Sequence, residues 1–187
     1  MRIEFLQYLM EFDIIDSTNE YLKQNYQKLP NFTIVKANYQ TQGRGQFGRV
    51  WESNYKENLL FSILIKKDLP FLTNDINPIV VSSIFNTLDE YEIDCRYKFP
   101  NDILVGDKKI AGILIETKYD NQDLEYMVIG IGLNLNQDVF ESTQAISLRH
   151  LINIDVDIDY VFKRLLKHLS NNVLLANLMH LGDKDEY

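Results

Sequence analysis

The sequence predicts an α+β fold, with a mixed, mainly antiparallel β-sheet and helices packed on it. Short β-type runs fill residues 93–135, and the turn signals GDK and DNQ between them are typical of an antiparallel hairpin series. Two further β-rich runs, 32–39 and 58–66, precede that series. Apolar residues recur with helical spacing at 77–91 and 159–179.

The first element in chain order is a helix that begins near Ser17. This serine stands three residues before Glu20, which is the spacing of a capping box. The run FTIVKANY at 32–39 then leads into GRGQFGRVW at 43–51, and the apolar run NLLFSILIK follows at 58–66. The glycine-rich segment is therefore predicted to join two strands.

Two more helices are predicted on either side of the hairpin series. In residues 77–91 the apolar side chains follow a helical period, and Pro78 suits the first turn. Residues 159–179 form an amphipathic pattern preceded by aspartates. The alternation NIDVDID at 153–159 lacks the glycine of a calcium loop, so a solvated turn is expected there.

Composition bounds the possible functions. The chain has 187 residues, 45% of them hydrophobic, which suits one folded domain. The net charge of -8 and the lack of a Lys/Arg run argue against binding to nucleic acid. Cys95 is the only cysteine, and core packing is its expected role. The N-terminus lacks a signal-peptide pattern and no apolar run reaches membrane-spanning length, so a cytoplasmic protein without a membrane partner is predicted.

The glycine-rich segment has the composition of an anion-binding loop. Its glycines let backbone N–H groups approach an anion, while Arg44 and Arg49 add charge and bidentate hydrogen bonds, so a phosphate or a carboxylate is the expected guest. GRGQFG matches G-x-G-x-x-G but leads towards a strand and lacks the Lys-Ser/Thr of a P-loop, which disfavours a Rossmann site. A flexible hairpin with solvated arginines explains this segment equally well on its own.

Three further motifs carry polar groups suited to a site. In KFPND (98–102), Asp102 could hold magnesium. In KKIAGILIE (108–116), Lys109 precedes Ala111 and Gly112, whose small size would let a ligand lie against the strand. In GIGLNLN (130–136), Asn134 offers a neutral donor and acceptor. Each motif alone is also explained by a plain turn or an edge strand.

The ordered series STN, YQTQGRGQFGRVW, KFPNDI, KKIAGILIE and GIGLNLN resembles the catalytic domain of biotin protein ligases, also called biotin–acetyl-CoA-carboxylase ligases, over residues 12–152. The resemblance implies a class II synthetase/biotin-lipoate ligase-like fold. Residues 1–187 would form a single catalytic domain, without the winged helix-turn-helix or the C-terminal β-barrel of some members. It also implies an ATP-dependent enzyme that uses Mg²⁺, forms biotinyl-5′-AMP and biotinylates a lysine of a biotin carboxyl carrier protein. A homodimer is compatible with the family.

The resemblance also implies the site residues. Arg44 and Lys109 would be catalytic cations that bring two anions together. The biotin site would comprise Ser17, Thr18, Asn19, Gln40, Gly43, Arg44, Gly45, Lys109 and Gly112. The nucleotide site would comprise Arg44, Gln46, Arg49, Trp51, Asn101, Lys109 and Asn134, with magnesium at Asp102. Trp51 is expected to close the pocket wall rather than stack on adenine, and Phe140 is a candidate adenine partner. Gln46 stands where the family commonly has a second loop arginine, which implies weaker retention of the adenylate.

Two alternatives stay open at this point. Lipoate–protein ligases and octanoyltransferases share the architecture, although the chain lacks their RRxSGGGxVxHD-type stretch. A non-catalytic biotin- or nucleotide-binding module would use the same pocket residues without the reaction.

Overall fold

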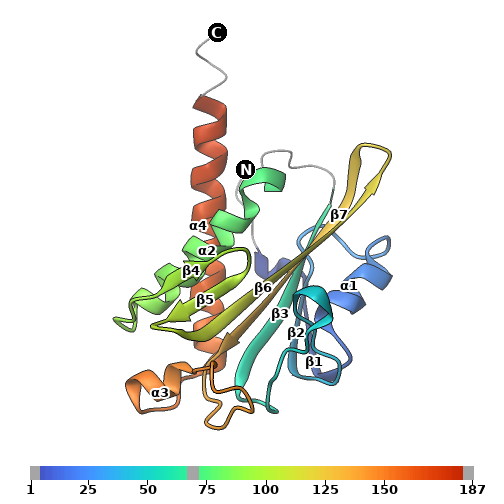
Figure 1. The fold of residues 1–187 in the computed structure, drawn as a ribbon. Helices are drawn as coiled ribbons and strands as arrows, with labels where there is room; N and C mark the ends of the chain where they lie inside the picture. Colours follow the sequence, from blue (N-terminus) through green and yellow to red (C-terminus); the bar gives the residue numbers. More distant parts are fainter. Residues whose placement is uncertain (1–4, 67–71, 183–187) are drawn as a thin grey trace.

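Seven strands form one sheet in the order β1-β2-β3-β7-β6-β5-β4. The computed structural model describes residues 5–66 and 72–182 (Figure 1). In chain order the elements, with η for a 3-10 helix, are η1 (Phe5–Tyr8), β1 (Leu9–Ile15), α1 (Thr18–Asn25), β2 (Ile34–Gln40), η2 (Gln46–Gly48), β3 (Asn58–Lys66), α2 (Leu72–Asp89), β4 (Arg96–Lys98), β5 (Asp102–Val105), β6 (Lys108–Asp120), β7 (Asp123–Asn134), α3 (Leu148–Ile152) and α4 (Ile158–Gly182).

The strand pairing confirms the predicted mixed, mainly antiparallel sheet. Among the described strands, β1 and β2 run parallel, and every other neighbouring pair is antiparallel. The strands β4 to β7 form the predicted hairpin series, and the glycine-rich segment joins β2 to β3 as predicted. Because β3 pairs with β7 across the middle of the sheet, segments far apart in sequence meet there.

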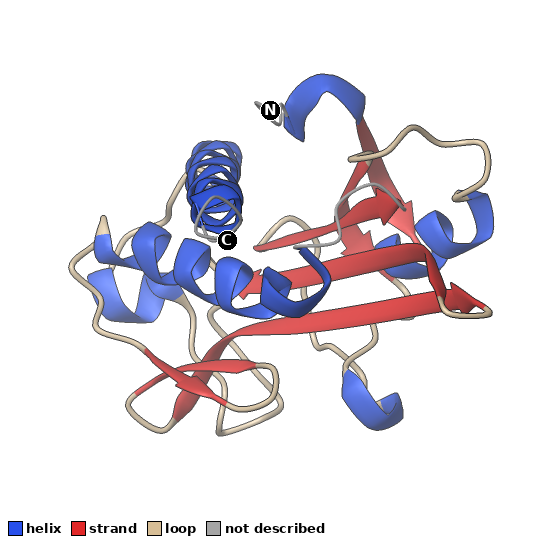
Figure 2. Ribbon diagram, turned by 90° about the horizontal axis from the view of Figure 1, so that it is seen from above, coloured by secondary structure: helices blue, strands red, loops and turns tan. Residues whose placement is uncertain are grey.

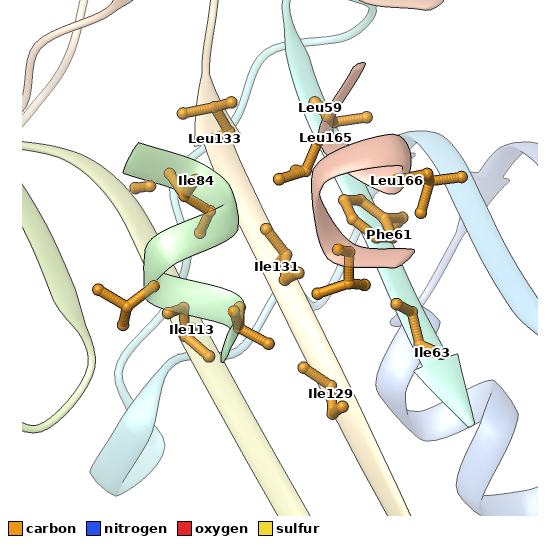
Figure 3. Packing of buried hydrophobic residues seen from close by; sticks show 14 of the residues in the cluster. Leu59, Phe61, Ile63, Ile84, Ile113, Ile129, Ile131, Leu133, Leu165 and Leu166 are labelled. Carbon is orange, nitrogen blue, oxygen red and sulfur yellow. The ribbon is translucent and has the colours of Figure 1, made fainter. Parts of the chain in front are cut away.

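The main hydrophobic core lies between one face of the sheet and the helices α2 and α4 (Figure 2). Figure 3 shows Phe61 of β3 and Ile131 of β7 beside Ile84 of α2 and Leu165 of α4. All four side chains are buried. Burial of one side chain of this size contributes about 1.5–3 kcal/mol. The core therefore fixes the two helices on this face.

The opposite face of the sheet receives α1. Successive residues of a strand point to opposite faces, so Ser62 and Leu64 point away from Phe61 and from the main core. The helix α1 packs Leu22 against Leu64 and Val128. Ser17 caps α1 as predicted, because its hydroxyl oxygen accepts a hydrogen bond from the Glu20 N–H at 3.4 Å. The strands beside α1 on this face carry glycines.

Three features of the fold differ from the sequence-based expectations. The sequence does not predict β1, whose residues are mostly half-exposed and whose parallel partner β2 follows only after α1. The expected start of α2 at Asn77 is wrong: the helix begins at Leu72, so Pro78 lies in its interior rather than in its first turn. Proline costs one helical hydrogen bond, and burial of Ile79 and Val80 beside it offsets that loss. The sequence also does not predict α3, because a helix of five residues is too short to show a helical period of apolar side chains.

The last helix, expected at 159–179, is confirmed as α4 over Ile158–Gly182. Cys95 lies directly before β4 and packs on the main core, and burial raises the pKa of its thiol to about 11. None of the helices within residues 5–66 and 72–182 is long and apolar enough to cross a membrane.

Glu90, which follows α2, holds α4 through an ionic contact. Its carboxylate accepts hydrogen bonds from Arg164 at 2.8 and 2.5 Å and lies 2.6 Å from His168 Nε2. The hydrogen bonds from Arg164, opposed by partial burial and helped by His168, lower the pKa of Glu90 to about 2. A carboxylate with a lowered pKa stabilises the fold above its ordinary pKa of 4.5 and loses that contribution as the pH falls towards 2.

We therefore expect Glu90→Gln to lower the free energy of unfolding by about 1 kcal/mol at neutral pH. Urea unfolding at a series of pH values would check this. The difference between variant and wild type should stay constant down to about pH 4.5 and shrink below it. Glu92→Gln, an exposed neighbour, is the control. A difference that persists unchanged at the lowest pH would contradict the assignment.

Candidate active site

Three glycines open a trough on the sheet face opposite α2 and α4. Gly112 of β6 and Gly132 of β7 are cross-strand partners, and Leu60 of β3 completes their row. Gly130 of β7 pairs with Ser62 of β3 in the next row. Paired residues point to the same face, so the two rows lie side by side. The floor of the trough therefore lies close to the backbone.

Two side chains lie in this trough. The indole of Trp51 covers two of the glycines: a Cβ atom added at Gly132 would lie 2.6 Å from its ring, and one added at Gly112 would lie 2.7 Å from it. A Cβ atom at Gly130 would collide with the Asn19 side chain. Any larger residue at these three positions would therefore displace Trp51 or Asn19.

The first pocket lies between the trough, α1 and the glycine-rich loop. Its lining comes from segments that are distant in sequence but meet on this face of the sheet. The lining residues are Ser17, Thr18, Asn19, Gln40, Arg44, Gly45, Trp51, Leu60, Phe61, Asn101, Lys109, Gly112, Ile113, Leu114, Gly130, Ile131 and Gly132. Arg44 and Lys109 thus line the same pocket, as the sequence predicts.

One end of the first pocket is a buried polar network. The Thr18 N–H donates to Gln40 Oε1 at 2.8 Å, and Thr18 Oγ1 lies 2.6 Å from Ser62 Oγ. The Ser62 hydroxyl donates to Asn19 Oδ1 at 2.5 Å. Thr18, Asn19 and Ser62 are at most 5% exposed. Buried polar groups that satisfy one another hold a fixed geometry, so this end of the pocket is preorganised.

Lys109 lies at the boundary between this pocket and a second one. Its ammonium is 2.6 Å from Asp102 Oδ1 and 5.2 Å from the centre of the Trp51 ring. The backbone around it is also held: Lys109 N–H donates to the Gln144 carbonyl at 2.7 Å, and the Lys109 carbonyl accepts from Ile146 N–H at 3.0 Å. The cation is therefore positioned before any ligand arrives.

Arg44 is held less firmly than Lys109. Its side chain is 54% exposed, and the one ion pair that it forms within the described residues is with Glu20 at 3.7 Å. The loop that carries it is locally constrained, because Gly45 N–H donates to the Arg49 carbonyl at 2.7 Å. Gly48 has a φ of 74°, which favours glycine. Arg44 is thus a largely exposed cation on a locally constrained loop.

The second pocket continues from Lys109 and Trp51. It is lined by Arg49, Val50, Trp51, Glu52, Lys98, Asp102, Leu104, Asp107, Lys109, Asn134, Phe140, Ser142, Gln144 and Ala145. Two polar atoms at this boundary are buried without a hydrogen-bond partner among the described residues: Asn134 Oδ1 and Trp51 Nε1. Buried polar atoms are nearly always paired, so each is a candidate partner for a ligand group.

Glu52 ties the two loops that flank the second pocket. Its Oε1 accepts hydrogen bonds from Glu141 N–H at 2.6 Å and from Gln137 Nε2 at 3.4 Å, and its Oε2 accepts from Ser142 N–H at 3.4 Å. Gln137 is itself fully buried. The position of the loop formed by residues 137–147 thus depends on a residue next to Trp51.

We expect Glu52→Ala to free this loop without unfolding the domain. The amide hydrogens of residues 139–145 should exchange at least about tenfold faster, because the loop loses its anchoring acceptor. Hydrogen-exchange mass spectrometry of that peptide would measure the change. Glu57→Ala is the control, since the Glu57 carboxylate accepts from Asn54 within its own segment. Equal exchange rates in Glu52→Ala and wild type would contradict the assignment.

Asp102 is the predicted magnesium ligand. Within residues 5–66 and 72–182 no three His, Cys, Asp or Glu side chains are grouped to hold a metal ion. Magnesium is usually bound by one or two protein carboxylates together with phosphate oxygens and water. Asp102 therefore fits a magnesium ion that arrives with a phosphate ligand, and it does not belong to a dedicated cage.

Comparison with known proteins shows the family of the chain. Residues 11–134 match the biotin/lipoate A/B protein ligase family. The chain belongs to this family. The bifunctional ligase/repressor BirA of Bacillus subtilis is 32% identical over 134 residues, which are 70% of this chain and 41% of that protein. BirA of Escherichia coli is 34% identical over 124 residues, which are 65% of this chain and 39% of that protein. The chain thus spans about two fifths of the length of these curated relatives.

Solved structures of biotin/lipoate ligases confirm the predicted fold. Biotin protein ligase from Aquifex aeolicus in complex with biotin and ATP has a TM-score of 0.74 and 31% identity, and the match covers 89% of this chain and 70% of that chain. A putative lipoate protein ligase from T. acidophilum with bound lipoic acid has a TM-score of 0.58 at 15% identity, with coverage of 89% and 85%. The second likeness concerns the fold alone.

Most of the predicted site residues of this family member meet in the two pockets. Those in the first pocket are Ser17, Thr18, Asn19, Gln40, Arg44, Gly45, Trp51, Asn101, Lys109 and Gly112. Those in the second are Arg49, Trp51, Asp102, Lys109 and Asn134, together with Phe140. Gly43 and Gln46 line neither pocket. The Gly43 carbonyl accepts from Trp51 N–H at 3.0 Å, and the Gln46 carbonyl accepts from Arg49 N–H at 3.2 Å, so both shape the loop.

Sequence reasoning missed three residues around these pockets: Glu52, Ser62 and Glu116. Ser62 interrupts the apolar run NLLFSILIK, and Glu116 ends the apolar run IAGILIE. Ser62 therefore carried a signal, namely a polar residue within a buried strand, whereas Glu116 lies at the partly exposed end of an apolar run. Glu52 follows a tryptophan in a loop and carries no such signal.

Proposed function

We propose that this chain is the catalytic part of an ATP-dependent biotin protein ligase. It would join biotin and ATP into biotinyl-5′-AMP, release pyrophosphate, and pass the biotinyl group to a lysine of a biotin carboxyl carrier protein. One observation carries the proposal: Arg44 and Lys109 line the same pocket, and Lys109 also lines the adjoining second pocket. Two cations that line one pocket, one of them at the boundary with the adjoining pocket, suit a reaction between two anions.

The first step joins a carboxylate to a phosphate. A carboxylate oxygen of biotin attacks the α-phosphorus of ATP, the bond from that phosphorus to its bridging oxygen breaks, and pyrophosphate leaves with the electron pair. Cations held in advance reduce the repulsion between the reactants and stabilise the charge that develops. Lys109 supplies one cation at the boundary of the pockets, and Arg44 on the glycine-rich loop supplies the second.

The second step needs no covalent bond to this protein. The amine of the carrier lysine attacks the acyl carbon of the adenylate, the bond from that carbon to the AMP oxygen breaks, and the attacking nitrogen loses a proton. Burial of the adenylate beside Trp51 would protect it from water until the carrier arrives. The cysteine in the chain is therefore not required for transfer, in agreement with the partly buried place of Cys95 against the core.

The two pockets suit the two substrates. The buried polar end with Thr18 and Gln40 suits the ureido ring of biotin, which is polar and uncharged. The second pocket suits ATP, because Arg49 and Lys98 add charge for phosphates and Asn134 Oδ1 is an acceptor for an amino or hydroxyl group of the nucleotide. The similar ligase from Aquifex aeolicus is in complex with biotin and ATP, which supports the choice of these two substrates.

Magnesium would accompany ATP and offset charge on the phosphates as pyrophosphate leaves. Asp102 is the residue that we assign to it. In the structure the Asp102 carboxylate is paired with the Lys109 ammonium. It therefore lies beside the group that we assign to the reacting phosphate, where the magnesium ion that accompanies ATP would also bind.

The decisive experiment is ATP–pyrophosphate exchange with purified protein, followed by transfer of labelled biotin to a carrier domain. We expect exchange that depends on biotin and magnesium, and label on the carrier lysine. Lipoate and octanoate in place of biotin test the related ligase activities and should support no exchange. Biotin binding without exchange would instead indicate a non-catalytic binding module.

We place the reaction in the cytoplasm, where ATP is available, and expect neither nucleic acid nor a membrane as partner. The net charge of -8 supports the first exclusion. The strand β1 forms one edge of the described sheet, which supports pairing of two copies into a homodimer. Light scattering on the purified chain would decide its oligomeric state.

A further inference from the structure

The polar end of the first pocket is connected to a carboxylate behind it. Asn19 Nδ2 donates to Glu116 Oε2 at 2.8 Å and lies 3.3 Å from the Leu114 carbonyl. Glu116 in turn accepts from Lys23 Nζ at 2.8 Å. Hydrogen bonds to Glu116 and Glu20 raise the pKa of Lys23, even though burial, the largest single influence, opposes its charge. Glu116 is thus an acceptor on both of its oxygens.

This anchor fixes the orientation of Asn19. A carboxylate and a carbonyl are both pure acceptors, so the NH₂ group of Asn19 must face them and Oδ1 must face Ser62. An amide oxygen is also a pure acceptor, so the single hydroxyl proton of Ser62 must point at Asn19 Oδ1, 2.5 Å away.

The same rule then fixes the Thr18 hydroxyl. Because the Ser62 proton is used, Ser62 Oγ can only accept from Thr18 Oγ1, which lies 2.6 Å away. Thr18 has one hydroxyl proton. It points to Ser62 Oγ, because the other acceptor, Gln40 Oε1, is more distant at 3.1 Å. Towards a ligand, the Thr18 hydroxyl is therefore an acceptor.

Its neighbours at the pocket have the opposite character. Gln40 Oε1 is occupied by the Thr18 N–H, which leaves the NH₂ group of Gln40 as its donor. Ser17 Oγ accepts from Glu20 N–H as a helix cap, so its hydroxyl proton remains for a ligand. The three side chains all line the pocket and together present one acceptor and two donors.

We propose that Ser62 and Glu116 are positioning residues that set the hydrogen-bond polarity of the biotin pocket for a cyclic urea. A urea edge carries an N–H, which needs an acceptor such as Thr18, and a carbonyl oxygen, which takes two donors such as Ser17 and Gln40. Neither Ser62 nor Glu116 needs to touch the ligand. The inference rests on the proposed function, because it names the group that the first pocket selects.

The test is isothermal titration of the chain with biotin and with lipoate, which shares the carboxylate chain and a sulfur-containing ring but has no ureido group. We expect Ser62→Ala to raise the Kd for biotin about tenfold, which corresponds to about 1.4 kcal/mol. Glu116→Met should raise it at least about threefold, since the Leu114 carbonyl still holds Asn19 in part. Binding of lipoate should be the same in every variant.

Two variants serve as controls. Glu116→Gln keeps one oxygen that can accept from Asn19, while Lys23 keeps its ion pair with Glu20 at 3.0 Å, so this variant should bind biotin within about twofold of wild type. Ser83→Ala removes another fully buried hydroxyl, one that donates to the Ile79 carbonyl in α2, and should leave the Kd unchanged. If Ser62→Ala fails to fold, the comparison of Glu116→Met with Glu116→Gln still tests the inference.

Wild-type affinity for biotin in both Ser62→Ala and Glu116→Met would overturn the inference while leaving the proposed function intact. Equal losses of lipoate and biotin binding would also overturn it, because the effect would then be structural. Failure of the wild-type chain to bind biotin would overturn both proposals.

Discussion

Replacement of Lys109 by alanine should lower biotin-dependent ATP–pyrophosphate exchange by about a thousandfold while leaving the fold intact. The ammonium is the one cationic group that lines both pockets within the described residues. Removal of a single preorganised group that stabilises developing charge typically costs about 10²–10³ in rate, and Lys109 also offsets the repulsion between the two substrates. The loss should therefore be at the upper end of this range.

The fold should survive because Lys109 supports it mainly through its backbone. Its N–H and carbonyl bonds to Gln144 and Ile146 do not involve the side chain. The ion pair with Asp102 is partly exposed and contributes at most about 1 kcal/mol. Thermal melting would measure the change in stability of Lys109→Ala. Lys108→Ala, the exposed neighbour, should show normal exchange. Near-normal turnover of a normally folded Lys109→Ala protein would refute the assigned role.

Replacement of Gly112 by alanine should lower the rate of adenylate formation by about a hundredfold. The added methyl group would lie 2.7 Å from the Trp51 ring and 3.0 Å from Lys109 Nζ, so the wall of the pocket and the cation must both shift. A misplacement of about 1 Å in a catalytic arrangement can cost about 10²-fold. Exchange kinetics at saturating biotin and ATP would measure the loss.

A second background separates this cause from a general defect. In Trp51→Phe the smaller ring lacks the atom that the methyl group meets, so Gly112→Ala should cost less than about tenfold there. The same loss in both backgrounds would show that Trp51 does not transmit the effect. Melting temperatures of the four proteins provide the control for folding.

Much of this site could be predicted because its chemistry is carried by short local patterns. The capping-box spacing of Ser17 and Glu20 placed α1, and the turn signals placed the hairpins of β4 to β7. The glycine-rich loop, Lys109 and Gly112 lie in motifs whose order along the chain is specific. The parallel pairing of β1 with β2 was beyond such reasoning, because it depends on a crossover through α1 and not on a local period.

The residues that support the site illustrate the same limit. Ser62 acts through contacts with Thr18 and Asn19 that span 44 and 43 positions of the chain. Glu52 reaches Glu141 across 89 positions. Nothing in the neighbourhood of either residue encodes its partner, since the partner is brought near only by the order of the strands.

By itself the sequence determined which local elements form, which loop can bind an anion and which cations are available, because hydrophobic period, capping and glycine content act over a few residues. The tertiary structure alone decided that Trp51 lies on Gly112 and Gly132, that Ser62 joins Thr18 to Asn19, and that Glu116 orients Asn19. The physical reason is the pairing of β3 with β7 and of β7 with β6. Register between distant strands places side chains on a common face, and that register follows from burial across the whole sheet.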